Sequence, residues 1–342
     1  MGKLKLLFQA VVLYCSGLWL LFRRANKRKL LILMYHGIVE KDINVWTQVP
    51  VAEFDRQMAW LKKNYTVVPL EDAIDMLRGN KPMPDYTAAI TFDDGFLNNK
   101  TIAYPILKKY NLPATIFLST SLIDDTNDLD GLLWPDFVTC LIRMTKTDKL
   151  DMQDIGLSEY TLDSPAARDA ATNTIVEQFK KESNDEKIRK IKFIKELAGI
   201  DCLDADSTCY KGMSWDDVIE LDKEGLISFG AHTISHPILS RISEDDIRRE
   251  IVESKNIISQ KLGKEIKTFA YPNGNPEDYN EYARKIAQQN FICTLTTEEA
   301  LNAIGDDVYS LRRVGPGNKT TLLQFKLLVS RAITVWMRLI GR

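Results

Sequence analysis

The chain has 342 residues, 45% of them apolar and 27% charged, a balance that is typical of a globular protein with one sizeable core. Its 45 basic and 47 acidic residues leave a net charge of −2, so no overall positive field draws it to nucleic acid, and we expect no nucleic-acid partner. The five cysteines are odd in number and scattered, which argues against a disulfide framework and weakly favours a reducing compartment.

The N-terminus departs from this composition, and we expect residues 1–28 to form a membrane-associating helix. Leu6–Phe22 is nearly uninterrupted apolar sequence, at the short limit of length for crossing a bilayer. No small-residue cleavage site follows it, which argues against a cleaved signal peptide. Basic residues follow instead, so we expect the remaining chain on the cytoplasmic face of a membrane; they are Arg23, Arg24, Lys27, Arg28 and Lys29. A helix buried in the core is the alternative.

Apolar runs alternate with amphipathic helical patterns through residues 29–123 and 212–318, which we assign to one domain. Strands are expected at Leu30–Tyr35, Ala88–Phe92, Ala114–Leu118, Ile227–Ala231, Lys267–Tyr271 and Phe291–Leu295. Helices are expected at Val51–Lys63, Leu70–Gly79, Ile102–Tyr110, Trp215–Glu224, Glu244–Leu262 and Tyr279–Gln289. Such units predict an α/β fold whose parallel strands form a barrel or an open sheet. In both architectures, chemistry gathers at the carboxyl ends of the strands.

Residues 124–211 break this alternation and are predicted to be an inserted helical segment. Their later part is polar, charge-rich helical sequence such as Ile175–Leu197. An insertion on such a scaffold can shape a substrate cleft or a lid. Trp134, in Leu133-Trp134-Pro135, is a candidate for stacking on a sugar ring, and the alternative is that it anchors the small core of the insertion.

The C-terminus, residues 319–342, is predicted to be a basic amphipathic helix lying in a membrane interface. Apolar residues recur there at helical spacing, while basic residues gather on another face. The apolar positions are Leu322, Phe325, Val329, Ile333, Trp336 and Ile340, and the basic ones include Arg331, Arg338 and Arg342. A terminal helix docked on the outside of the domain fits the same pattern.

Two adjacent carboxylates stand at the end of a predicted buried strand. Gly95 permits a sharp turn after Ala88–Phe92, so Asp93 and Asp94 fall at the carboxyl end of this strand. Because neighbouring side chains point in different directions, one carboxylate can ligate a metal while the other takes a proton from water. A helix-capping pair of aspartates before Phe96 is the alternative.

Two of the three histidines, His232 and His236, are four residues apart and follow a predicted strand. A helical turn would bring both imidazoles to one side, and Asp94 would complete a set of two histidines and one carboxylate with open coordination positions. Zinc is the expected divalent ion, and iron, cobalt, nickel and manganese suit the same ligands. The third histidine, His36, also ends a predicted strand and is a candidate proton donor to a leaving amine; a structural histidine is the alternative.

These motifs resemble those of the polysaccharide deacetylases, the NodB-homology or carbohydrate esterase family 4 enzymes, over about residues 29–317 apart from the inserted helices. Thr91–Gly95 matches the first family motif, and His232–His236 matches the second, His-Ser/Thr-x-x-His. The resemblance implies a distorted, TIM-like (β/α)7 barrel and a divalent metal held by Asp94, His232 and His236. It also implies Asp93 as the general base in removal of an N-acetyl group from an amino sugar.

The third family motif, Arg-x-Pro-Tyr, is altered. Ala270 stands where the family has an arginine that orients the base, and Asn273 replaces the tyrosine. The Asn273 backbone N–H, which the resemblance assigns to the oxyanion, survives this change, and Tyr271 is a further candidate for oxyanion or substrate contact. Arg313, at another expected strand end, is the candidate replacement for the missing cation. The family's late Leu-x-x-His motif is missing, and resemblance to the branch with an early histidine implies His36 as the acid.

The sequence therefore predicts a metal-dependent deacetylase that acts on an amino sugar in a polysaccharide, an oligosaccharide or a lipid-linked glycan. The two terminal segments predict a membrane surface as a second partner. Two alternatives stay open. One is a deformylase or O-acetyl esterase acting on a related sugar, and the other is a non-catalytic, membrane-associated glycan-binding protein.

Overall fold

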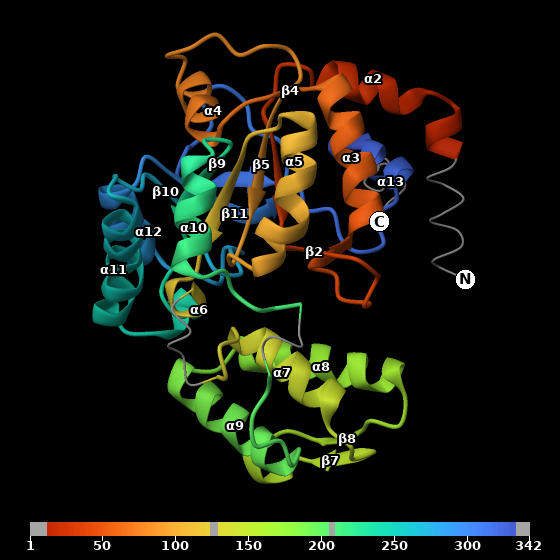
Figure 1. The fold of residues 1–342 in the computed structure, drawn as a ribbon, viewed down its shortest axis with the longest axis vertical. Helices are drawn as coiled ribbons and strands as arrows, with labels where there is room; N and C mark the ends of the chain where they lie inside the picture. The colour runs from red at the N-terminus through yellow and green to blue at the C-terminus, as the bar shows by residue number, and fades with distance from the viewer. Residues whose placement is uncertain (1–11, 124–128, 205–208, 333–342) are drawn as a thin grey trace.

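The computed structural model describes residues 12–123, 129–204 and 209–332 (Figure 1). Its main element within these ranges is an eight-stranded sheet in the order β1-β5-β6-β9-β10-β11-β12, with β4 paired to β5. All of these strands pair in parallel. Their bounds are β1 Leu31–Tyr35, β4 Thr66–Val67, β5 Thr87–Phe92, β6 Ala114–Leu118, β9 Ile227–Ala231, β10 Thr268–Ala270, β11 Cys293–Glu299 and β12 Leu311–Arg313.

Contacts between the first strand and the end of the last one curl this sheet into a nearly closed barrel. Leu33 forms a parallel bridge with Val314. The Met34 N–H donates to the Val314 carbonyl at 3.0 Å, and the Val314 N–H donates to the Ile32 carbonyl at 2.8 Å. The expectation of an α/β fold with parallel strands is confirmed, and the strands form a nearly closed barrel.

Helices cover the outside of the barrel between successive strands (Figure 1). Apart from the short helix α6, which the sequence did not predict, they begin and end close to the expected residues, because capping residues in the sequence define their ends. The Ser243 hydroxyl, for example, accepts from the Asp246 N–H where α11 begins, and Gly263, with a φ of 64°, ends this helix. The helices are α3 Val51–Asn64, α4 Leu70–Leu77, α5 Tyr104–Tyr110, α6 Thr120–Ile123, α10 Trp215–Lys223, α11 Glu244–Leu262 and α12 Glu281–Asn290.

A second group of elements lies beside the barrel, between α6 and α10 in the chain and at the bottom of Figure 1. The Ser183 hydroxyl caps a helix by accepting from the Glu186 N–H, so the predicted helical stretch Ile175–Leu197 is divided between two helices. These elements enclose an apolar core of their own, which includes Phe137 and Ile191. They are α7 Trp134–Met144, α8 Pro165–Phe179, α9 Asn184–Leu197 and the hairpin of β7 Lys149–Asp151 with β8 Glu159–Thr161.

Near the N-terminus, α2 (Leu18–Ala25) docks on the barrel side. Gly17, with a φ of 74°, interrupts the described part of the predicted apolar segment, and residues 6–11 of that segment lie outside the described residues. The Arg23 guanidinium lies 4.1 Å from the ring centre of Tyr86 and donates to the Asn64 carbonyl at 2.7 Å. Among the described residues, no helix combines the length and apolar character needed to cross a bilayer.

The C-terminal helix α13 (Leu322–Val329) packs against α3. Its residues Phe325, Leu327 and Val329 are buried, and the Phe325 ring lies edge-on to Trp60 with 5.9 Å between centroids. This part of the predicted amphipathic helix is therefore docked on the outside of the domain, as the alternative interpretation of the sequence expected. The predicted apolar positions 333, 336 and 340 lie outside the described residues.

Candidate active site

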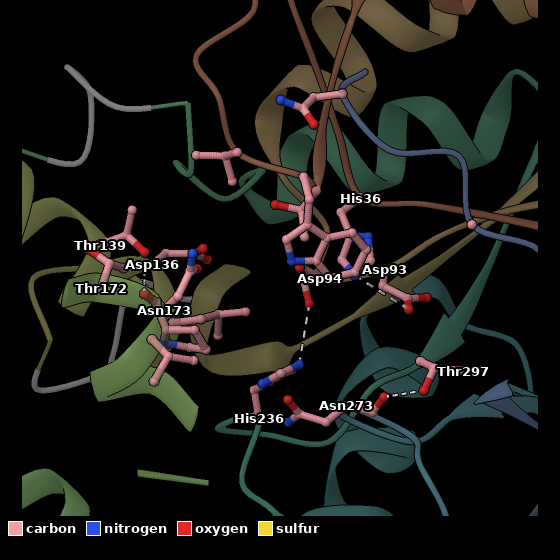
Figure 2. Close-up of a pocket in the computed structure, with 18 of the residues that line it drawn as sticks. His36, Asp93, Asp94, Asp136, Thr139, Thr172, Asn173, His236, Asn273 and Thr297 are labelled. Carbon is pink, nitrogen blue, oxygen red and sulfur yellow. Dashed lines mark hydrogen bonds and ion pairs between the residues drawn. The ribbon is translucent and has the colours of Figure 1, made fainter. Parts of the chain in front are cut away.

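Strand ends bring the three predicted metal ligands together in space. Asp94 follows β5, and His232 and His236 follow β9. The Asp94 Oδ1 atom lies 3.6 Å from His232 Nε2 and 3.6 Å from His236 Nε2, and all three side chains are buried. Figure 2 shows the contact between Asp94 and His236.

The donor atoms of this cluster fit a divalent cation. The Asp94 Oδ1 atom is buried and has no hydrogen-bond partner among the described residues. His232 Nδ1 lies 2.7 Å from the Ala270 carbonyl oxygen, which favours a proton on Nδ1 and leaves the Nε2 lone pair facing Asp94. Two imidazoles and one carboxylate are ligands that zinc and related metals accept, and a cation would satisfy the orphaned oxygen.

The pKa directions agree with this fit. Burial raises the pKa of Asp94 well above its usual value, and the neighbouring carboxyl groups of Asp136 and Asp93 add to the effect. Burial lowers the pKa values of His232 and His236, so both imidazoles stay neutral at physiological pH. A neutral imidazole is the form that binds a metal, and a cation would offset the burial of the Asp94 charge.

The loop that carries His232 and His236 is held in place by hydrogen bonds to helix α11. Glu250 on α11 is buried and accepts from the Ile234 and Ser235 N–H groups at 2.8 and 2.9 Å and from the Ser235 hydroxyl at 2.7 Å. Thr233 and His236 have φ values of 69° and 56°, an unfavourable region for residues other than glycine. Such conformations persist where surrounding contacts fix them, and they cluster at functional sites.

Asp93 forms a buried, two-pronged ion pair with Arg313 at the end of β12. Arg313 Nη1 donates to Asp93 Oδ1 at 2.7 Å, and Nη2 donates to Oδ2 at 2.8 Å. Arg313 Nε donates to the Thr296 carbonyl at 2.8 Å, which fixes the guanidinium plane. Burial alone would raise the pKa of Asp93, but the charge of Arg313 opposes it and the net pKa is low, so Asp93 is ionised at neutral pH.

His36 lies beside this pair, with Nε2 4.0 Å from Asp93 Oδ2. The Asn99 side chain fixes its backbone by donating to the His36 carbonyl at 2.6 Å. Burial lowers the pKa of His36 to about 4 despite the opposing effect of Asp93, so the free imidazole is neutral at physiological pH. The Trp46 ring meets the His36 ring edge-on at a centroid distance of 5.4 Å.

Of the residues in the altered third motif, Asn273 lies at the cavity and Tyr271 does not. Asn273 lines the cavity with a φ of 58°, and its backbone N–H has no acceptor in the described part of the chain. Tyr271 is fully buried, stacks on Tyr279 at 4.0 Å between centroids and does not line the cavity. The expectation of Tyr271 as an oxyanion or substrate residue is therefore wrong, because its ring packs against Phe269 and Tyr279, away from the cavity.

The expectation that Trp134 stacks on a sugar also fails. This side chain is 2% exposed, belongs to the core of the inserted helices and does not line the cavity. Its indole N–H donates to the His236 carbonyl at 3.2 Å. The anchoring alternative therefore fits the structure, and Trp134 also contacts the loop that carries His232 and His236.

All the reactive groups open into one cavity of about 690 Å³ between the barrel and the inserted helices. Figure 2 shows Asp136, Thr139, Thr172 and Asn173 grouped on one side of it, across from Asp94 and His236. These wall residues were not predicted from the sequence, and neither was Trp46, which lines the cavity and is 58% exposed. An exposed tryptophan in a polar loop is a weak sequence signal, and no spacing rule connects it to the catalytic motifs.

Comparison with known proteins places these features in a family. Over 92 residues, the chain is 42% identical to YxkH of Bacillus subtilis (strain 168), which is named as a polysaccharide deacetylase; the match covers 26% of this chain and 32% of YxkH. It is 33% identical over 116 residues to a poly-beta-1,6-N-acetyl-D-glucosamine N-deacetylase of Staphylococcus epidermidis, covering 30% of this chain and 40% of the relative. These matches span less than half of each relative.

Solved structures of low sequence identity share the fold over nearly the whole chain. The Streptococcus pyogenes deacetylase PplD in complex with acetate superposes with a TM-score of 0.59 at 20% identity, covering 88% of this chain and 98% of PplD. IcaB from Ammonifex degensii gives a TM-score of 0.59 at 17% identity, with 89% and 97% covered. The family model for polysaccharide deacetylases matches residues 80–292, which is more than half of the chain. The chain belongs to the polysaccharide deacetylase family.

Proposed function

We propose that this protein is a metal-dependent N-deacetylase acting on an N-acetylated amino sugar within a glycan. One observation carries the proposal: the buried triad of Asp94, His232 and His236 stands beside Asp93, a carboxylate that Arg313 keeps ionised and fixed. This arrangement separates a ligand carboxylate from a base carboxylate. Metal-assisted amide hydrolysis needs that separation.

Zinc is the proposed ion because its usual ligands are histidine nitrogens and carboxylate oxygens, although iron, cobalt, nickel and manganese accept the same set. Asp94, His232 and His236 would hold it, with open positions toward the cavity. When bound, such an ion polarises a carbonyl group and lowers the pKa of a water molecule.

The residues of the chain then divide the remaining chemistry. Asp93 accepts the proton of the attacking water, and Arg313 holds the Asp93 carboxylate in place. The Asn273 backbone N–H stabilises the oxyanion that forms on the acetamide carbonyl. His36, which is neutral in the free site, takes up the proton that Asp93 received from the water and delivers it to the leaving nitrogen as the C–N bond breaks. The products are acetate and a free amino sugar.

The names of the relatives support the proposed substrate class. Two of them, from Escherichia coli K12 and Staphylococcus epidermidis, are named for poly-beta-1,6-N-acetyl-D-glucosamine, and the proposed substrate is an N-acetylglucosamine-containing polysaccharide or oligosaccharide of this kind. A lipid-linked amino sugar is the second candidate. The E. coli relative is 36% identical over 73 residues, covering 21% of this chain and 11% of its own length.

A substrate panel tests the proposal. The purified, zinc-loaded full chain is incubated with N-acetylglucosamine oligomers of β-1,6 and β-1,4 linkage, a lipid-linked N-acetyl amino sugar, a formamido analogue and an O-acetyl sugar. Acetate release from an N-acetylated glycan is expected to exceed formate release and ester hydrolysis. Preference for the formamide or the ester would favour the related hydrolases, and metal binding without any hydrolysis would favour a non-catalytic glycan-binding protein.

A membrane surface is proposed as a second partner, with the catalytic domain on its cytoplasmic side. Leu18, Leu20 and Leu21 of α2 are 42%, 49% and 64% exposed, and basic side chains such as Arg24 are near them in sequence. Apolar and basic residues together suit the interface of an anionic bilayer. We expect the full chain to float with anionic vesicles and the double variant Leu20→Ser/Leu21→Ser to float less. Equal flotation of both would remove this part of the proposal.

A further inference from the structure

The walls of the active-site cavity come from two parts of the fold, and only one of them carries the catalytic groups. Asp136 and Thr139 on α7, with Thr172 and Asn173 on α8, line the cavity from the inserted helices. The cavity volume of about 690 Å³ lies well within the range of sites that take drug-sized ligands, about 300–1,000 Å³. There is room for more than the acetamide group and the ring that bears it.

The polar groups on this wall are not used to hold the insertion together. Neither the Asp136 carboxyl nor the Asn173 amide has a hydrogen-bond or ion-pair partner among the residues that the structure describes. The neighbouring hydroxyls of Thr139 and Thr172 donate to their own helices, at the Pro135 and Arg168 carbonyls, and keep their lone pairs free. Burial raises the pKa of Asp136 to about 8, so this carboxyl can donate as well as accept a hydrogen bond near neutral pH.

An aromatic face completes the cavity. Trp46 is 58% exposed although a ring of this size usually packs in the core. Its loop is held by α7, since Arg143 donates to the Ile43 carbonyl at 3.1 Å and pairs with Asp169 at 2.6 Å, and Asp169 also accepts from Asn44. The inserted helices thus fix the loop that presents Trp46 beside His36.

Sugar rings match this combination. They offer an apolar face of C–H groups that stacks on an aromatic ring and an edge of hydroxyls that bonds carboxyl and amide groups. We propose that Trp46, Asp136 and Asn173 form a binding site for a second sugar unit of the glycan, next to the unit that loses its acetyl group. This inference rests on the proposed function and deepens it, because it assigns the contact with the neighbouring sugar unit to the inserted helices and to the loop that they hold.

Binding measurements test the inference without turnover. The zinc-loaded Asp93→Asn protein is titrated by calorimetry with N-acetylglucosamine and with its β-1,6- and β-1,4-linked tetramers. We expect at least one tetramer to bind ten-fold or more tightly than the monosaccharide. Adding Asp136→Ala or Trp46→Ala should abolish most of this gain, and Trp46→Phe should keep it because it retains an aromatic face.

Asp154→Ala serves as the matched control, because Asp154 is an exposed aspartate of the insertion that does not line the cavity. The inference is overturned if the tetramers bind no better than the monosaccharide, or if both Asp136→Ala and Trp46→Ala retain the tetramer affinity of the control. Trp46 lies outside the insertion, so it decides the question if Asp136→Ala fails to fold. Failure of the proposed function would appear elsewhere, as a wild-type protein that releases no acetate.

Discussion

At the scale of single residues, the site depends on a pair that the sequence separates by 220 positions, Asp93 and Arg313. The functional role of the motif around Asp93 could be predicted from the sequence, since two adjacent carboxylates at the end of a buried strand are typical of a catalytic site. Ala270 left the orienting cation unaccounted for, and Arg313 was a candidate only through its expected strand end. The pairing itself could not be read from one sequence, because it depends on closure of the barrel between β12 and β1.

Arg313→Met should expose the role of this pair. Without Arg313, burial raises the pKa of Asp93, so the carboxylate becomes protonated and inactive at a higher pH than in the wild type. We expect the acid limb of the pH profile of kcat/KM to move to higher pH and kcat/KM at neutral pH to fall about 100-fold or more. The kcat/KM of Arg313→Lys should lie between the values of the wild type and Arg313→Met, since lysine keeps the charge but loses the two-pronged geometry.

The neighbouring residue supplies the control for this variant. Arg312 pairs with Asp306 at the surface and does not line the cavity, so Arg312→Met should leave the pH profile in place. An unshifted acid limb in Arg313→Met, in a protein whose circular dichroism matches that of the wild type, would show that Arg313 does not tune the base.

At the scale of elements, α11 and the inserted helices support the histidine loop from two sides. Glu250 was not recognised in the sequence, because a single glutamate on an amphipathic helix is normally a solvent-facing residue. Here it is 5% exposed and binds the backbone between His232 and His236. Trp134 was predicted to contact a sugar, but its indole lies in the core of the insertion and binds the His236 carbonyl. The sequence does not reveal the direction in which this side chain points.

Glu250→Gln should weaken metal binding without touching a ligand. The glutamine amide is uncharged and keeps only one of the two acceptor oxygens that bind the backbone N–H groups and the Ser235 hydroxyl. The loop of His232 and His236 therefore loses part of its support. Zinc affinity measured by competition with a chelator should fall about 10- to 100-fold, the usual effect of removing an outer-sphere partner. Glu253→Gln, at an exposed position of the same helix, should bind zinc like the wild type, and equal affinities of the two variants would contradict this role.

A buried lysine links α9 to α7 and makes stability depend on pH. Lys187 is 1% exposed, lies over the Trp134 ring at 4.4 Å, and burial lowers its pKa from 10.5 to about 8. The unfolded chain therefore binds more protons than the folded one between about pH 8 and 10.5, so this residue makes stability rise with pH in that window. The effect amounts to roughly 3 kcal/mol.

Urea unfolding of Lys187→Met and the wild type measures this contribution. The free energy of unfolding of the variant, relative to that of the wild type, should be most favourable at pH 7 and should decline by about 3 kcal/mol toward pH 10.5. Lys146→Met, at an exposed site of the insertion, controls for loss of a lysine. A difference between Lys187→Met and wild type that stays constant over this range would show that Lys187 is not held in an unfavourable charged state.

At the scale of the whole molecule, the barrel was the most predictable part because its information is local. Strands such as β6 and β9 start and end at the expected residues, since apolar runs and caps are encoded within a few positions. The β7–β8 hairpin of the insertion was missed because its strands are three residues long. The docking of α2 was also not readable, as it needs the distant rings of Trp60, Tyr65 and Tyr86 around Arg23.

The central claim is that Asp94 binds the metal while its neighbour Asp93 acts as the base. Metal content and acetate release, measured together on the wild type, Asp93→Asn and Asp94→Ala, test it most directly. We expect one zinc per chain and acetate release in the wild type, one zinc and at least a 100-fold loss of rate in Asp93→Asn, and loss of both in Asp94→Ala. Full zinc content in Asp94→Ala, or near-normal acetate release by zinc-loaded Asp93→Asn, would contradict the division of labour between these two aspartates.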